Sequence, residues 1–379
     1  MAISIEPKIF MNKHSKISLL TFVLLVLFVP LKVTSQNEAD FANFLKAGEK
    51  DASKLMTAYL EPAVISMSYG MTGGWYNTAK PHKSLGFDIG ITANFAFIPS
   101  SENYFNPNSL NLTTTTYNGA RPNGSTAPYD PDRKAPTFFG PKDETQYTST
   151  YDDPILGPQS ISYSGPEGLD VKDAIGFAAT PVPMIQLGVG VIKNTDVKIR
   201  FANSAMVGSV IPNVEIENSE FTIFGIGVMH DIKQHIKGIK MLPFDLSAMV
   251  AYNSVSGTTD LSNTNTSDDR PDSEDGELDY KFNSWVLDAM ISKKISVLTG
   301  YAGFGYSIIN TNVDVNGKYV IDSSNPDFVL TNPVAIDYKN NSVRFLLGMR
   351  LKFGPLYLSG DYTFQKFNTF TFGIGFAVR

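Results

Sequence analysis

The chain has 379 residues, contains no cysteine and carries a formal net charge of −6. The missing cysteines exclude disulfides and thiolate metal sites, and the negative charge argues against a nucleic-acid partner. A mean hydropathy of −0.07 with 26 Phe and 17 Tyr suits a large sheet, whether in a barrel or in a soluble sandwich. Nothing in the composition calls for a cofactor, and we expect none.

Residues 1–35 have the pattern of a secretory signal peptide. Lys13, His14 and Lys16 precede an apolar stretch at about 17–29, and cleavage is expected before Gln36. A membrane-anchor helix is the alternative, but the apolar stretch is shorter than the roughly 20 residues that a spanning helix needs. No later segment is apolar enough to cross a bilayer as a helix. The exported chain is therefore expected to be either soluble or a β-barrel.

Residues 36–62 are predicted to form a helical hatch or a periplasmic arm. Apolar residues recur at helical spacing between 37 and 60, Asn37 is a candidate cap, and Pro62 is expected to end the helix. The side chains expected to plug or gate a lumen are Phe41, Phe44, Leu45, Met56 and Tyr59.

A two-residue alternation of apolar and polar or small residues follows from residue 63 to the end of the chain. It is strict in the last strand, where five apolar residues alternate with small or polar ones up to Val378, as is usual for the final strand of an outer-membrane barrel. Eleven segments carry the pattern: 64–76, 85–98, 183–191, 197–201, 224–228, 244–253, 284–291, 298–308, 342–353, 356–365 and 370–378.

Connection lengths favour a membrane barrel over a sandwich, because short and long connections alternate. The long, external ones are expected at 99–180, 257–277 and 312–341, and the periplasmic ones at 77–84, 193–196, 230–243, 292–295 and 354–355. The predicted fold is all-β: a transmembrane antiparallel β-barrel over residues 63–379 with about 12 strands, in a range of 10–14. A closed barrel needs an even number of strands, so another strand lies within 99–180 or the segment 64–76 is misread. A third alternative is that the helix of residues 37–60 enters the lumen before the first strand begins.

Charged residues recur on the face that would line the lumen. Opposite charges in a narrow barrel either pair as a structural network or form a selectivity lining. The residues concerned are Asp88, Lys198, Arg200, Asp245, Asp288, Arg344, Arg350, Lys352 and Asp361.

Motifs for metal binding or catalysis are weak. His230 and His235 lie five residues apart and do not share a helix face as an i, i+4 pair does, so we expect no metal there. Seven carboxylates between 268 and 279 form either a solvated acidic loop or a calcium site. Because His82, His230 and His235 all fall in expected periplasmic turns, no serine–histidine pair is expected near the outer leaflet, and the chain is not expected to be an enzyme.

Three blocks of sequence resemble a family of Gram-negative outer-membrane proteins that carries a domain-of-unknown-function label. They are residues 74–88 (GWYNTAKPHKSLGFD), 230–245 (HDIKQ with GIK and LPFD) and, more weakly, 135–140. The resemblance covers the mature chain. It implies a fold similar to that of long-chain fatty acid transporter barrels, in which an N-terminal hatch fills the lumen and hydrophobic solutes diffuse through.

Two functions are therefore open for a protein of the outer membrane in contact with lipid. The first is passive uptake of hydrophobic or small amphipathic solutes past the hatch. The second is a non-transport scaffold that docks a periplasmic or secretion partner through residues 230–243, where Lys233, Lys237 and Lys240 alternate with apolar residues.

Overall fold

The computed structural model describes residues 40–153, 157–170, 172, 177–206, 219–262, 271–322 and 325–378. The expected signal peptide, the Asn37 cap and the first part of the acidic loop lie outside these residues. No helix in the described part of the chain is both long and apolar enough to cross a membrane.

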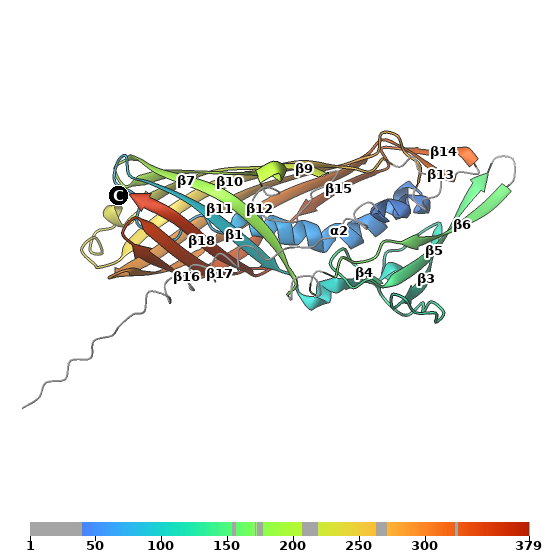
Figure 1. Cartoon of the computed structure of the whole chain (residues 1–379), viewed down its shortest axis with the longest axis horizontal. Helices are drawn as coiled ribbons and strands as arrows, with labels where there is room; N and C mark the ends of the chain where they lie inside the picture. Colours follow the sequence, from blue (N-terminus) through green and yellow to red (C-terminus); the bar gives the residue numbers. More distant parts are fainter. Residues whose placement is uncertain are drawn as a thin grey trace, which may run out of the picture.

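Ten antiparallel strands close into a barrel (Figure 1). The ring runs β11-β10-β9-β8-β7-β1-β18-β17-β16-β12, and pairing between β12 and β11 closes it. The strands are β1 (Phe87–Phe97), β7 (Ala179–Ile192), β8 (Thr195–Asn203), β9 (Ser219–Asp231), β10 (Asp245–Asp260), β11 (Glu277–Ile295), β12 (Leu298–Asn316), β16 (Ser342–Phe353), β17 (Leu356–Phe364) and β18 (Thr369–Val378). The predicted antiparallel barrel is confirmed, but the count of about 12 strands is wrong.

The miscount comes from the segment 64–76, which is not a strand. Helix α2 spans Glu49–Thr72 with Pro62 inside it, so the expected end of the helix at Pro62 is also wrong. Its second half is almost entirely buried, from Val64 to Thr72 with only Met67 partly exposed, although Glu49, Lys50 and Glu61 are exposed. A helix buried on all sides has no clean polar face, and its apolar run cannot be told from a strand by periodicity alone.

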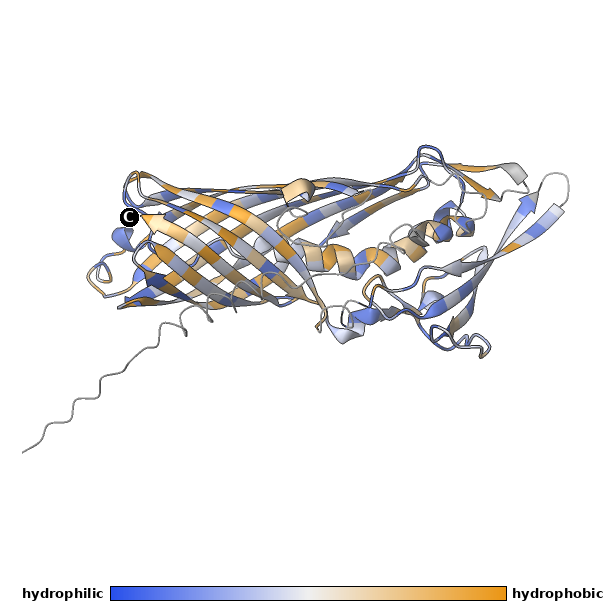
Figure 2. Ribbon diagram, in the orientation of Figure 1, coloured by the Kyte–Doolittle hydropathy of each residue, from blue (hydrophilic) through white to orange (hydrophobic). Residues whose placement is uncertain are grey.

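Along each strand the outward side chains are mostly apolar, and the polar and small side chains point inward together with some apolar ones. Phe345 and Leu347 of β16 are 42% and 48% exposed, whereas Arg344 and Leu346, which alternate with them, are buried. Figure 2 shows the same alternation of apolar and polar residues over the barrel wall. The outer surface of the sheet is thus an apolar belt, and the packed core of the molecule lies in the lumen.

The two ends of the barrel differ in their connections. At one end, called the turn end, lie the short connections 193–194, 296–297 and 354–355, the segment 232–244 and Val378. The expected turn at 292–295 is displaced because β11 continues to Ile295 and β12 begins at Leu298. The segment 232–244 contains one short 3-10 helix, η5 (Lys233–His235).

The opposite, loop end carries additional sheets. Residues 99–170, called the cap, contain the sheet of β3 (Thr115–Arg121), β5 (Glu144–Asp153) and β6 (Gly157–Gly165), the pair β2 (Tyr104–Phe105) and β4 (Ala135–Pro136), and the 3-10 helices η3 (Ser100–Asn103) and η4 (Pro107–Ser109). A hairpin of β13 (Lys318–Asp322) and β14 (Asn325–Thr331) follows the extended end of β12, and β15 (Val334–Lys339) pairs with β12. In its described residues, the long segment 99–180 thus contributes no barrel strand before Ala179, and the cap folds over the loop end.

Candidate functional site

The lumen is occupied by the chain's own N-terminal region. The 3-10 helix η2 (Asp40–Ala47) packs against β5, β6 and β13 at the loop end, and α2 then contacts β1, β7, β11, β12 and β15. Residues 73–86 continue to the turn end, where β1 begins. Figure 1 shows α2 running lengthwise from the loop end into the barrel. Residues 40–86, called the hatch, therefore pass through the barrel from its loop end to its turn end.

The loop half of the lumen is apolar. Leu55 and Met56 of α2 belong to one buried cluster with the inward side chains Val182, Met184 and Phe282 of the barrel wall. The approach is close: a Cβ added at Gly70 would lie 2.7 Å from Val182 Cγ2. Glycine at this position lets the helix backbone contact the wall directly.

The predicted hatch residues lie in this core, although two of them face the cap. Phe44, Leu45, Met56 and Tyr59 are all buried, and the side chain of Phe41 lies outside the described residues. Phe44 contacts Tyr147 of the cap edge-on, and the Tyr59 hydroxyl donates to the Glu167 carbonyl at 2.7 Å. The hatch and the cap thus share one hydrophobic core.

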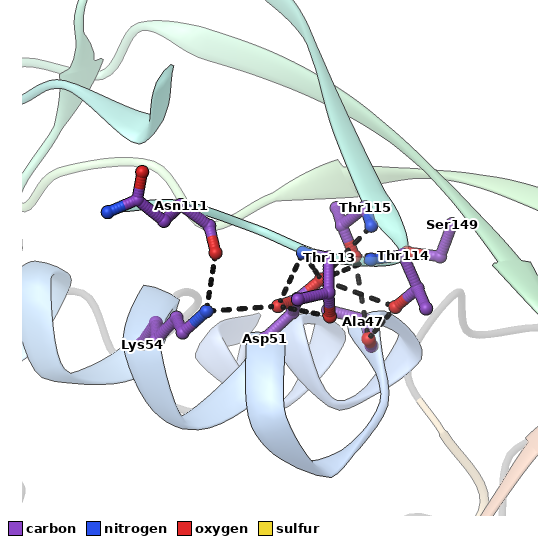
Figure 3. A network of polar contacts seen from close by, with 8 residues as sticks. All are labelled: Ala47, Asp51, Lys54, Asn111, Thr113, Thr114, Thr115 and Ser149. Carbon is purple, nitrogen blue, oxygen red and sulfur yellow. Dashed lines mark hydrogen bonds and ion pairs between the residues drawn. The ribbon is translucent and has the colours of Figure 1, made fainter. Parts of the chain in front are cut away.

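Asp51 joins the same two parts by hydrogen bonds (Figure 3). Its Oδ2 accepts from the backbone N–H groups of Thr113, Thr114 and Thr115 at 2.8, 2.9 and 3.0 Å, and two threonine hydroxyls donate at 3.2 Å. Burial raises the pKa of Asp51, but the hydrogen bonds from Thr114 and Thr113 outweigh it and hold the pKa below its ordinary value of 3.8. Asp51 is therefore ionised at neutral pH and tethers α2 to the cap.

Two buried arginines hold the C-terminus of α2 in mid-barrel. Arg200 Nη1 donates to the Met71 carbonyl at 3.3 Å, and Arg344 Nη1 donates to the Thr72 carbonyl at 2.8 Å. The last carbonyls of a helix lack intrahelical partners and carry partial negative charge, which cations complement. We call Arg200, Arg344 and these two carbonyls the latch.

Below the latch, Trp75 and Tyr76 fill the turn half of the lumen. They form a buried cluster with Met229, Met249 and Met290, and the Arg200 guanidinium lies 3.7 Å from the Trp75 ring centroid. The sequence reading missed both aromatic residues as plug residues. The sequence signal for them was the inward glycines of β9 and β12. Gly225 and Gly227 of β9 leave space for the Trp75 ring, and Gly303 of β12 leaves space for Tyr76.

The nine charged residues expected to line the lumen face inward, and each contacts another charged residue, a neighbouring residue of the barrel wall or the hatch. Arg344 Nε lies 3.6 Å from Asp288, and Lys198 Nζ lies 3.5 Å from Asp88. At the turn end, Asp245 lies 3.9 Å from Lys80, and Lys352 donates to the Ala377 carbonyl. Of the remaining three, Arg200 belongs to the latch. Arg350 and Asp361 contact Tyr357 and Tyr301 respectively. This arrangement agrees with a structural network rather than an open selectivity lining.

The histidines occupy two separate places. His82, expected in a turn, is buried between Asp196 (2.8 Å from Nδ1) and Asp88 (3.4 Å from Nε2). His230 and His235 lie together at the turn end with their Nε2 atoms 3.0 Å apart. Among the described residues, no group of three or more histidine, aspartate or glutamate side chains could hold a metal ion.

Comparison with known proteins identifies a matching family model and several solved structures with a similar fold. A family model described as a family of unknown function (DUF6588) matches residues 11–378, and no curated protein sequence matches the chain significantly. The fold is similar to that of Ail from Yersinia pestis, with 6% identity, 78% of this chain and 100% of Ail covered, and a TM-score of 0.24. It is also similar to the translocator domain of the autotransporter NalP from Neisseria meningitidis, with 9% identity, 78% and 88% covered, and a TM-score of 0.31. It is similar as well to the outer membrane transporter YddB from Escherichia coli, with 10% identity, 75% of this chain and 40% of YddB covered, and a TM-score of 0.22.

Proposed function

The chain belongs to the DUF6588 family of unknown function, and we propose that it is an outer-membrane barrel for passive uptake of hydrophobic or small amphipathic solutes past its hatch. The expected signal peptide would export it, and cleavage would release the mature chain. The short turns at one end and the long loops at the other support an orientation with the turn end in the periplasm and the cap outside.

The outer belt supports the membrane location. Every barrel strand is paired on both sides, so the wall leaves no row of unpaired backbone groups to face hydrocarbon. Exposed Phe, Leu, Ile and Val side chains cover the wall, as in known transmembrane barrels. In a soluble protein the same belt would be a very large exposed apolar patch.

The observation that carries the uptake proposal is the apolar inner wall of the loop half. Water-filled porins have polar interiors, whereas here Val182, Met184 and Phe282 face the lumen and contact α2. An apolar solute entering from the loop end can replace contacts that the helix makes with this wall.

A reversible crosslink tests whether the hatch must move. A Cβ at residue 70 would lie 3.5 Å from the Cβ of residue 182, which lies within the range for disulfides. The chain has no cysteine, so Gly70→Cys with Val182→Cys forms a single defined pair. In proteoliposomes we expect entry of a fluorescent hydrophobic probe to stop when the pair is oxidised and to return on reduction.

The single variant Val182→Cys controls for the substitution, and deleting residues 38–60 should raise leak above the wild-type level. Equal probe flux through the oxidised and reduced double variant, together with unchanged leak in the deletion, would remove the uptake proposal.

A second candidate, the scaffold, draws on the turn end. Met241 is 95% exposed, Leu242 and Ile236 are exposed beside it, and Lys237 and Lys240 flank them. An apolar patch with a basic rim is a form that protein docking sites take. Reversing the charges of Lys237 and Lys240 should then release co-purifying periplasmic proteins, and an unaltered pull-down counts against this role. For either role we propose that the chain works without catalysis.

A further inference from the structure

A trough interrupts the apolar belt on the outside of the barrel. It has a volume of about 830 Å³ and is lined mainly by apolar side chains of β11, β12, β16, β17 and β18. That volume lies within the range of pockets that hold small-molecule ligands. Its residues extend from Lys293 and Phe244 at the turn end toward Tyr362 and Phe370.

Three small outward-facing residues make the floor. Gly300 and Ala302 of β12 pair with Met349 and Leu347 of β16, and Met349 pairs in turn with Gly360 of β17. Gly300 and Ala302 therefore lie between Lys293 and Ile291 of β11 on one side and Met349 and Leu347 of β16 on the other. Gly360 lies on the far side of Met349.

The floor glycines are not required by packing within the protein. A Cβ added at Gly300 would meet nothing within 4 Å, and one at Gly360 would meet only the Thr371 carbonyl at 3.8 Å and the Phe370 ring at 4.0 Å. Inward glycines behave differently, since a Cβ at Gly348 would overlap the Tyr301 ring. The trough is thus open space that another molecule has to fill, because an unfilled gap forfeits dispersion contacts on both sides.

We propose that the trough holds one acyl chain of an anionic glycerophospholipid, with its phosphate paired to Lys293. The proposal rests on the membrane location proposed above. A flexible chain can follow a narrow apolar trough, and the exposed Lys293 lies at the turn end of the barrel, where the lipid headgroups of that leaflet lie. Within a bilayer, association depends on polar contacts and close packing and not on a hydrophobic driving force. Lys293 supplies the polar contact, and the trough supplies the packing surface.

Native mass spectrometry of the full chain in detergent micelles tests the site with phosphatidylglycerol and phosphatidylcholine as probes. Filling the floor with Gly300→Leu and Gly360→Leu should lower the retained phosphatidylglycerol by about tenfold, or about 1.4 kcal/mol. Ala289→Leu is the matched control, because Ala289 is exposed on β11 outside the trough. Lys293→Gln should keep the lipid but lose the preference for phosphatidylglycerol.

Equal retention by the filled variant and by Ala289→Leu would overturn the proposal. A dimeric wild type that becomes monomeric in the filled variant would also overturn it, since a second copy of the chain would then occupy the trough. The change in gel mobility on boiling separates failure of the lipid site from failure of the proposed function. If the wild type shows no change in mobility, the membrane-barrel proposal is refuted. If the mobility changes normally but lipid retention is unselective, only the lipid site is refuted.

Discussion

Replacing Asp51 with alanine should detach the cap from α2. The carboxylate accepts three backbone and two hydroxyl hydrogen bonds from Thr113, Thr114 and Thr115. Hydrogen bonds to a charged group contribute about 1.5–3 kcal/mol each, and their sum is not additive because one side chain makes all of them. Since the substitution also leaves three N–H groups without their acceptor, we expect a loss of about 3–5 kcal/mol in the contact.

Hydrogen exchange of the Thr113–Thr115 amides measures this loss directly, because these amides exchange through local opening. The matched control is Lys54→Gln. Lys54 lies 3.6 Å from Asp51 but is 37% exposed, so its removal should change protection by less than about 1 kcal/mol. Protection in the alanine variant equal to that of the wild type would refute the tether.

The tether also sets a pH dependence. The folded-state pKa of Asp51 is lowered from 3.8, so the stabilisation is fully present above the unfolded value and is lost as the pH falls through the folded value. We expect amide protection in the wild type to be equal at pH 7 and pH 5 and to fall only below pH 3.8. A decline that begins near neutral pH would point to a different group.

Three further predictions concern residues of the hatch and of the lumen wall. Arg344→Gln should cost about 3–5 kcal/mol, because it removes the Thr72 contact and leaves the buried Asp288 unpaired; a lower midpoint for heat-induced gel mobility change checks this. Gly227→Ala should cost about 1–3 kcal/mol, since its Cβ would lie 3.0 Å from the Trp75 ring, and an unchanged midpoint would contradict the close approach. Lys50→Cys, near the start of α2, should react with a membrane-impermeant maleimide on intact cells, and labelling only after permeabilisation would reverse the assigned direction of the hatch.

The barrel strands could be predicted because their signal is local. Ten of the eleven expected segments correspond to the ten strands of the barrel ring. Each of these strands has one face toward the surroundings and one toward the lumen. The residue types on those faces show in a two-residue period whatever the strands pair with. The inward direction of Asp88, Arg200 and Arg344 followed from the same period.

The partners of those inward side chains could not be predicted. Arg200 and Arg344 bind the end of a helix more than 100 residues away in sequence, and Asp51 binds Thr113–Thr115 through contacts that leave no local pattern. The segment 64–72 was misread for a related reason, because burial among strands and the cap removed the polar face by which a helix is recognised.

By itself, then, the sequence determined the type of sheet, the side of each strand that carries apolar residues and the presence of an N-terminal helix. Only the tertiary structure decided that ten strands close the ring, that the hatch crosses the whole lumen, and that the buried charges serve to hold it. The physical reason is that side-chain alternation is a property of one strand, whereas ring closure and lumen packing depend on contacts between residues far apart in the chain.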